Sequence, residues 1–147
     1  MDSRSRCAWF IWWVHCVVLG LLLCASTAPV LAATWRVPAD FSTIQDAMDA
    51  SQPCDVVLVG PGTYSERVSV REGVRLIADG EPGEVILRPE RDDQGMAASE
   101  VVVLTNGSTV EGFTLRDAVI GISFTGLWSE ARNNIIYDVE VGISAFG

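Results

Sequence analysis

Short apolar runs separated by turn residues fill the sequence after position 55. The runs are rich in valine, isoleucine and leucine, a composition typical of β-strands. Between them stand groups that favour bends, such as Gly60-Pro61-Gly62 and Asn106-Gly107-Ser108. The pattern predicts strands at 56–59, 68–70, 74–78, 85–87, 101–104, 110–115, 120–124, 134–137 and 142–146.

One short helix is predicted ahead of these strands. Ser42 is followed three residues later by Gln45, the spacing of a helix-capping box. Apolar residues recur at helical spacing over 44–48, and Pro53 ends the pattern. We therefore expect a helix of about two turns at 43–51.

The strongest pattern is an internal repeat near the C-terminus. When residues 110–126 are laid over residues 131–147, an offset of 21 residues, five of the 17 positions are identical. Composition alone gives about one identity. A repeat of this length that holds short strands and no helix indicates a β-solenoid of about four coils, each stacked on the one before. A β-sandwich or antiparallel barrel also has short strands and turns, but neither predicts the repeat.

The first 32 residues have a different character. A 16-residue apolar run follows two arginines, and Val30-Leu31-Ala32 resembles a cleavage site. We predict a signal peptide at 1–32 and a partial β-solenoid domain at 33–147, exported to the periplasm, the extracellular space or the cell surface. The alternatives are an uncleaved anchor and a lipoprotein modified at Cys24, although the leucines before Cys24 are bulkier than that modification favours.

Composition narrows the possible partners of residues 33–147. This part holds eight arginines against 18 acids, a formal charge of −10, which excludes nucleic-acid binding as the main activity and argues against binding to anionic membranes. Cys54 is its only cysteine, and the only histidine of the chain, His15, lies in the leader. We expect Cys54 to be a small buried apolar residue.

Several segments carry a family resemblance. Residues 37–47 (VPADFSTIQDA), 55–59 (DVVLV) and 61–68 (PGTYSERV) resemble the N-terminal opening of right-handed parallel β-helix proteins of the pectin lyase-like superfamily, as found in pectin methylesterases and NosD-like periplasmic proteins. Residues 110–117 and 133–138, each followed by Gly-Ile-Ser, resemble standard coils of these proteins. The resemblance implies an all-β fold, a right-handed parallel β-helix, with the predicted helix as a short N-terminal cap.

The same resemblance implies a function connected with polysaccharides. The enzymes of the superfamily are lyases, esterases and epimerases, and its other members include adhesive, carbohydrate-binding and NosD-like accessory proteins. We expect the parent function to be recognition or processing of a polysaccharide, with a non-catalytic surface or periplasmic β-helix as the alternative.

Alternation along the strands identifies candidate ligand-binding residues. With Leu115 and Ile136 pointing inward, Arg116 and Tyr137 fall on the outer face of neighbouring coils, as do Thr114 and Ile135. We predict substrate binding by Arg116, Tyr137 and Asp138. For Asp138 and its repeat mate Asp117 the competing interpretation is structural, because aspartate often closes a turn at a strand end.

No catalytic residue is predicted. Residues 33–147 contain neither histidine nor lysine, and Asp117-Ala118-Val119 stands where pectin methylesterases have a characteristic glutamine. We also predict no metal site and no cofactor. Glu90, Asp92 and Asp93 form an acidic turn that leaves Ca²⁺ as an alternative, although it lacks the ligand spacing of a dedicated loop. We therefore expect no polysaccharide cleavage by this chain alone.

The C-terminal end affects the expected assembly. Residues 142–146 should form a strand of a complete coil, and no further coil follows in the sequence. We expect a β-helix truncated at the C-terminus, with self-association through its open edge.

Overall fold

The structure is a computed structural model that describes residues 31–81, 83–89 and 99–145 of the 147-residue chain. From Ala32 onward the chain forms one compact unit. Its elements are β1 (Thr34–Val37), α2 (Ile44–Ala50), β2 (Val56–Val59), β3 (Gly62–Ser65), β4 (Val68–Val70), β5 (Arg75–Ala78), β6 (Val85–Arg88), β7 (Glu100–Leu104), β8 (Thr109–Glu111), β9 (Thr114–Phe124), β10 (Glu130–Arg132) and β11 (Ile135–Ala145).

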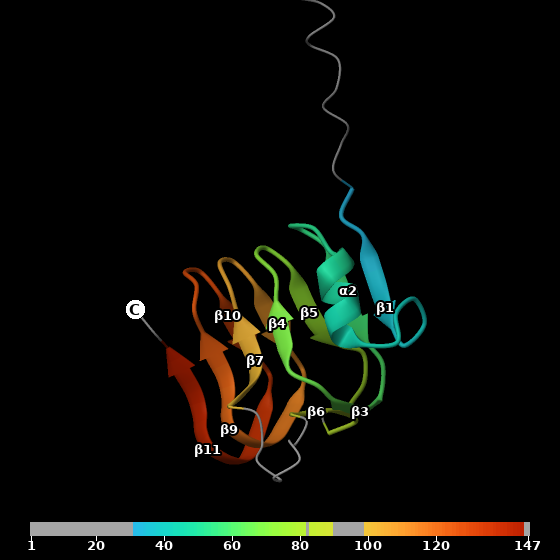
Figure 1. Cartoon of the computed structure of the whole chain (residues 1–147). Helices are drawn as coiled ribbons and strands as arrows, with labels where there is room; N and C mark the ends of the chain where they lie inside the picture. The colour runs from blue at the N-terminus through green and yellow to red at the C-terminus, as the bar shows by residue number, and fades with distance from the viewer. Residues whose placement is uncertain (1–30, 82, 90–98, 146–147) are drawn as a thin grey trace, which may run out of the picture. The chain divides into compact units, whose positions relative to one another are not determined.

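These strands stack as the coils of a parallel β-helix (Figure 1). All strand pairs of the described residues are parallel. One sheet has the order β1-β2-β5-β8-β10, and the second contains β3, β6 and β9 along one part and β4, β7 and β9 along the other, with β11 on β9. The predicted all-β solenoid is therefore confirmed.

Apolar residues at equivalent positions of successive coils build the core. Val57, Leu76 and Val110 occupy matching positions of β2, β5 and β8, and all three are fully buried. Leu87 and Leu115 form a second buried column. Because each inward side chain packs on its equivalent in the next coil, the sequence repeats where the coils stack.

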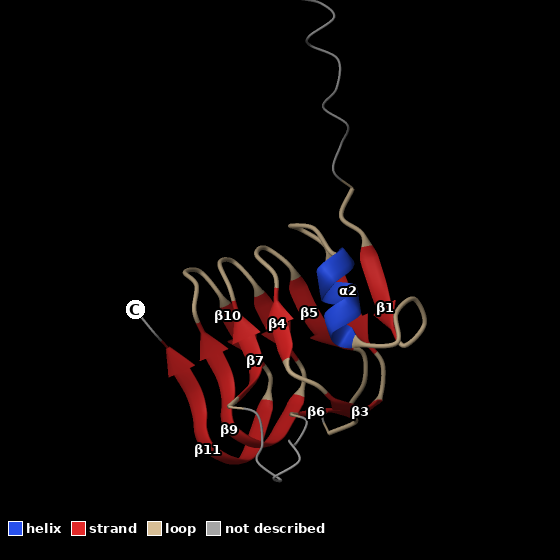
Figure 2. Ribbon diagram, in the orientation of Figure 1, coloured by secondary structure: helices blue, strands red, loops and turns tan. Residues whose placement is uncertain are grey.

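Helix α2 covers the N-terminal end of the stack, as predicted (Figure 2). Its apolar side is buried through Ile44, Ala47 and Met48. The N-cap is Thr43 and not Ser42: its hydroxyl accepts a hydrogen bond from the Asp46 N–H at 3.1 Å. A helix in this place shields apolar residues that would otherwise end the core in water.

Side chains of the first coil fasten this helix. The Glu66 carboxylate accepts hydrogen bonds from the Ile44 and Gln45 N–H groups at 3.0 and 2.9 Å. The Gln45 side-chain oxygen accepts a hydrogen bond from the Ser69 N–H at 2.9 Å. The Gln45 side chain thus bonds to the first coil and does not close a capping box. It satisfies the Ser69 backbone N–H group on the edge of β4.

Three strands were not predicted, and two are longer than predicted. β1, β3 and β10 have the sequences Thr-Trp-Arg-Val, Gly-Thr-Tyr-Ser and Glu-Ala-Arg, which are too polar or too short to stand out. Parallel neighbours supply their backbone hydrogen bonds, so tertiary context overrides their weak propensity. β9 and β11 continue without a break through positions where we expected loops.

Left-handed residues lie at stacked corners of the coils. Gly73 and Gly107 have φ of 67° and 61°, and Cys54 and Trp128 have φ of 79° and 62°. Backbone hydrogen bonds join these turns, from the Cys54 N–H to the Gly73 carbonyl and from the Gly107 N–H to the Leu127 carbonyl, each at 2.9 Å. The expectation that Cys54 is buried was wrong, because this corner points its side chain into solvent. The turn predicted at Asn106-Gly107-Ser108 is present.

Several predictions concern residues outside those described: residues 1–30 of the predicted signal peptide, the acidic turn at 90–93 and Phe146 at the end of the last predicted strand. Among the described residues, no helix combines the length and apolar character needed to cross a membrane. β11 pairs with β9 alone among these elements, and its Val141 and Ile143 are 43% and 57% exposed. Self-association through this strand stays a prediction.

Candidate functional site

A column of polar side chains runs across the outer face of β3, β6, β9 and β11. Ser65 pairs with Arg88, and Tyr137 pairs with Arg116. The pairing of Leu87 with Leu115 places the next residues, Arg88 and Arg116, beside each other on neighbouring strands. Four successive coils therefore present serine, arginine, arginine and tyrosine along one line, one strand spacing of about 4.8 Å apart.

Arg116 is the most closely surrounded member of this column. Its Nη1 lies 3.4 Å from the Tyr137 hydroxyl, to which it donates, and its Nε lies 3.4 Å from Asp117 Oδ2. The Nε atom is itself buried and, within the described part of the chain, forms no aligned hydrogen bond. The contact with Asp117 is thus ionic, and its two side chains, 33% and 32% exposed, gain little stability from it.

Arg88 was not predicted as a site residue. Its Nε donates to the Ser65 hydroxyl at 3.0 Å, and the side chain is exposed. The 21-residue repeat cannot find it, because Arg88 and Arg116 lie 28 positions apart, seven more than the repeat. The useful signal is the alternation in β6, where Val85 and Leu87 are buried and Arg88 is not.

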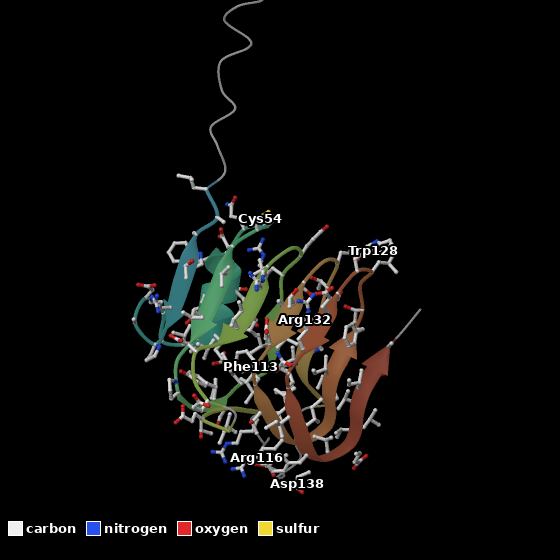
Figure 3. All side chains as sticks on the ribbon, turned by 180° about the vertical axis from the view of Figure 1, so that it is seen from behind. Cys54, Phe113, Arg116, Trp128, Arg132 and Asp138 are labelled. Atoms are coloured by element: carbon white, nitrogen blue, oxygen red, sulfur yellow. The ribbon has the colours of Figure 1, made fainter. Side chains whose placement is uncertain are left out.

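Tyr137 and Asp138 continue the column on β11. Tyr137 is 40% exposed and Asp138 is exposed. Figure 3 shows Arg116 and Asp138 at the same edge of the stack, away from the edge that carries Cys54 and Trp128. The pairing of the residues on either side places Asp138 over Asp117. The structure thus brings together all three predicted binding residues.

The two aspartates lie within strands and not at strand ends. Asp117 and Asp138 have φ of 62° and 54°, and at these points β9 and β11 bend from one part of the sheet to the next. Aspartate tolerates this left-handed conformation better than most residues. The structural interpretation therefore accounts for the backbone of both residues. The Asp117 carboxylate is half-buried beside Arg116, while the exposed Asp138 carboxylate is available as a hydrogen-bond acceptor.

A second row of side chains lies two residues before the polar column, and it is mainly apolar. Thr114 pairs with Ile86 on one side and Ile135 on the other. We expected Thr114 to be exposed, but it is 3% exposed, and among the described residues its hydroxyl has no hydrogen-bond partner. Its β-branched neighbours cover it. A ligand on this face therefore contacts Arg88, Arg116 and Tyr137. Beside them lies the apolar row formed by Ile86, Thr114 and Ile135.

No group of three or more His, Cys, Asp or Glu side chains within the described ranges is arranged to hold a metal ion. The acidic turn at 90–93, the alternative Ca²⁺ site, lies outside those ranges. The chemistry on this face is hydrogen-bonding, with charges of both signs: two guanidinium groups, two carboxylates, one phenol and the Ser65 hydroxyl.

Comparisons with known proteins find similarity among solved structures. No known protein family matches the sequence, and no curated protein matches it. Among solved structures, the chain is similar to a mutant of the PL6 family alginate lyase AlyGC, with 18% sequence identity and a TM-score of 0.47. The match covers 78% of this chain and 19% of the alginate lyase chain, so the chain spans about a fifth of that protein.

Proposed function

We propose that this protein is an exported parallel β-helix that recognises an acidic polysaccharide on the outer face formed by Arg88, Arg116 and Tyr137. The observation that carries the proposal is the neighbouring placement of two arginines on adjacent strands. The two guanidinium groups extend along this line, that of Arg88 toward Ser65 and that of Arg116 toward Tyr137. They therefore offer N–H donors to carboxylate groups spaced along a polymer, on a protein that is otherwise strongly acidic.

The residue types fit a uronic acid polymer. A guanidinium group offers a planar fork of N–H donors that matches a carboxylate in two parallel hydrogen bonds. The Tyr137 ring presents an apolar face and a hydroxyl to a sugar ring. Asp138, at the end of the column, accepts hydrogen bonds from sugar hydroxyls. Together these groups bind carboxylates and hydroxyls along one line.

Binding without catalysis is the form of the proposal that the side chains support. Acid–base chemistry on a glycan needs two groups of different protonation state near one reacting atom, and residues 33–147 contain no histidine and no lysine. We propose binding that needs no cofactor, so Ca²⁺ and a chelator should leave the affinity unchanged. The alternative is a parent lyase, esterase or epimerase, and product release from polygalacturonate or alginate would favour it.

We expect Arg116→Ala to weaken binding to polygalacturonate or alginate about tenfold, because it removes one charged hydrogen-bonding group. Titration calorimetry with oligosaccharides of these polymers measures the affinity. Arg88→Ala should have an effect of the same size. Affinity should also fall as salt rises, since exposed charges are screened.

Arg132→Ala is the matched control for this experiment. Arg132 lies on β10 in the other sheet and pairs with Glu130. The variant removes the same charge from the protein but leaves the proposed face intact, so its affinity should stay within about twofold of the parent. Equal losses in Arg132→Ala and Arg116→Ala, or equal binding of a neutral glucan, would contradict recognition by this face.

A further inference from the structure

The Asp55 carboxylate accepts three hydrogen bonds at the start of the first coil. It is 4% exposed, and its Oδ1 accepts the Ala33 N–H at 2.7 Å. Its Oδ2 accepts the Gln52 N–H at 2.9 Å and the Trp35 indole N–H at 3.3 Å. The Gln52 and Ala33 N–H groups hold the pKa of Asp55 below its ordinary value. Asp55 is therefore an anion at neutral pH.

Ala33 is fixed on both sides of its backbone. Its N–H donates to Asp55, and its carbonyl accepts the Val56 N–H at 2.9 Å. The ladder between β1 and β2 begins with the next residue, where Thr34 pairs with Val56. Leu31, two positions before Ala33, is 83% exposed. Ala33 is thus the point at which the chain joins the stack.

The predicted processing site coincides with this point. Cleavage after Val30-Leu31-Ala32 hydrolyses the bond between Ala32 and Ala33. One water molecule is consumed, Ala32 keeps the new carboxylate, and Ala33 keeps the nitrogen as an α-amino group. That nitrogen is the atom that lies 2.7 Å from Asp55 Oδ1. The contact with Val56 is made by the carbonyl of Ala33 and is not touched by the cleavage.

We propose that Asp55 is a built-in binding site for the α-ammonium group that removal of the leader creates on Ala33. Processing replaces the uncharged amide donor of Ala33 with a charged ammonium group. The contact with the Asp55 carboxylate then becomes a largely buried ion pair that fastens β1 to the first coil. This inference rests on the export part of the proposed function and is independent of polysaccharide binding. Cleavage one residue later removes Ala33 and leaves Asp55 Oδ1 without its donor.

Few charged groups surround the pair. On the neighbouring turn and strand stand Arg71, Glu72 and Arg75, all exposed, and beside Asp55 stands the exposed thiol of Cys54. The Arg75 N–H donates to the Asp55 backbone carbonyl at 3.0 Å. Because a thiol is also a nucleophile toward the ester, the acetylation is measured in a Cys54→Ser background.

The composition of the chain makes the test selective. The ten basic residues are all arginines, so the α-amino group is the single amine in the protein. The full chain is exported from a bacterial host, and the mass of the purified product should correspond to a start at Ala33. Its rate of acetylation by an amine-reactive ester is then followed against pH, folded and in urea.

We expect the folded protein to show an α-amino pKa about one unit above the ordinary value of about 7.7–8.0. At pH 7.5 its acetylation should therefore be about sevenfold slower than in urea or in Asp55→Asn. Equal rates in folded and urea-unfolded protein would overturn the proposal, and this comparison does not depend on whether Asp55→Asn folds.

Acetylated protein is a matched control for stability. Acetylation restores an amide on Ala33 without a charge, as in the unprocessed chain. The raised folded pKa means that the charge stabilises the fold fully below the unfolded pKa, and that this gain is lost as pH rises through the folded pKa. The free amine form should melt about 4 °C higher at pH 7, with no difference near pH 10.

The outcomes separate this inference from the proposed function. A product that starts at another residue contradicts the processing step, and an Ala33 start made by fusion cleavage then tests the Asp55 contact alone. An ordinary pKa in that protein would refute the ion pair. Loss of polysaccharide binding with the pKa shift intact would refute only the proposed ligand.

Discussion

Phe113→Ala should lower the free energy of unfolding by about 3–5 kcal/mol, because the side chain is fully buried between β8 and β9 and the substitution leaves a cavity. Figure 3 shows Phe113 within the stack. The backbone of this residue is held independently of its ring: its N–H donates to Asn134 Oδ1 at 3.0 Å, and its carbonyl accepts the Ile135 N–H at 2.9 Å. Urea unfolding followed by circular dichroism measures the loss.

Trp128→Ala provides the comparison. Trp128 is a larger aromatic residue, but it is 90% exposed. Its φ of 62° is as unfavourable for alanine as for tryptophan, so the substitution changes little backbone strain. We expect a change within about 0.5 kcal/mol. If both variants lost the same stability, the burial assigned to Phe113 would be incorrect.

The architecture was predictable because, in a solenoid, residues that pack on each other recur at a fixed spacing in the sequence. In the last two coils each inward residue stacks on its equivalent 21 positions later, as Leu115 does on Ile136. This periodicity indicated that the predicted strands belong to stacked coils. The helix was predictable for a local reason: Ile44, Ala47 and Met48 form its buried side, and that pattern needs no knowledge of the coils.

The corners of the coils were harder to predict. Cys54 looked like a core residue by type, but its position matches that of Gly73 and Gly107 in other coils, where the backbone turns left-handed and the side chain leaves the core. Asp117 and Asp138 looked like strand ends because aspartate is common there. In the structure, hydrogen bonds to neighbouring coils carry the strand through each bend.

The candidate site was predictable in part. Alternation placed Arg116 and Tyr137 on the outer face, and the repeat placed them side by side. Arg88 was missed because it lies 28 and not 21 positions before Arg116, so the offset of the repeat does not identify the residue beside it on the next strand. The hydrogen bonds of Asp55 to Ala33 and Trp35 were missed for another reason: they join residues 22 and 20 positions apart that share no repeat.

Gly121→Ala should destabilise the protein by about 2–3 kcal/mol through overpacking. Gly121 is buried in β9, and a Cβ atom there would lie 2.7 Å from the Gly142 carbonyl oxygen and 2.8 Å from Ile136 Cγ2. Side-chain carbons do not approach backbone oxygens so closely. The Gly142 oxygen belongs to β11, which pairs with β9 on both sides of this point, so it can retreat only by loosening that pairing. Urea unfolding measures the loss.

Gly142→Ala tests whether stacking, and not the glycine itself, causes this effect. Gly142 is the repeat equivalent of Gly121, 21 positions later in the same kind of strand. A Cβ at Gly142 meets nothing within 4 Å. Glycine to alanine in an unstrained strand also reduces the entropy of the unfolded chain, which favours folding by about 0.4–1 kcal/mol. We therefore expect Gly142→Ala to be neutral or slightly stabilising. Equal destabilisation by the two variants would mean that the requirement for glycine comes from the backbone of each strand and not from close contact between coils.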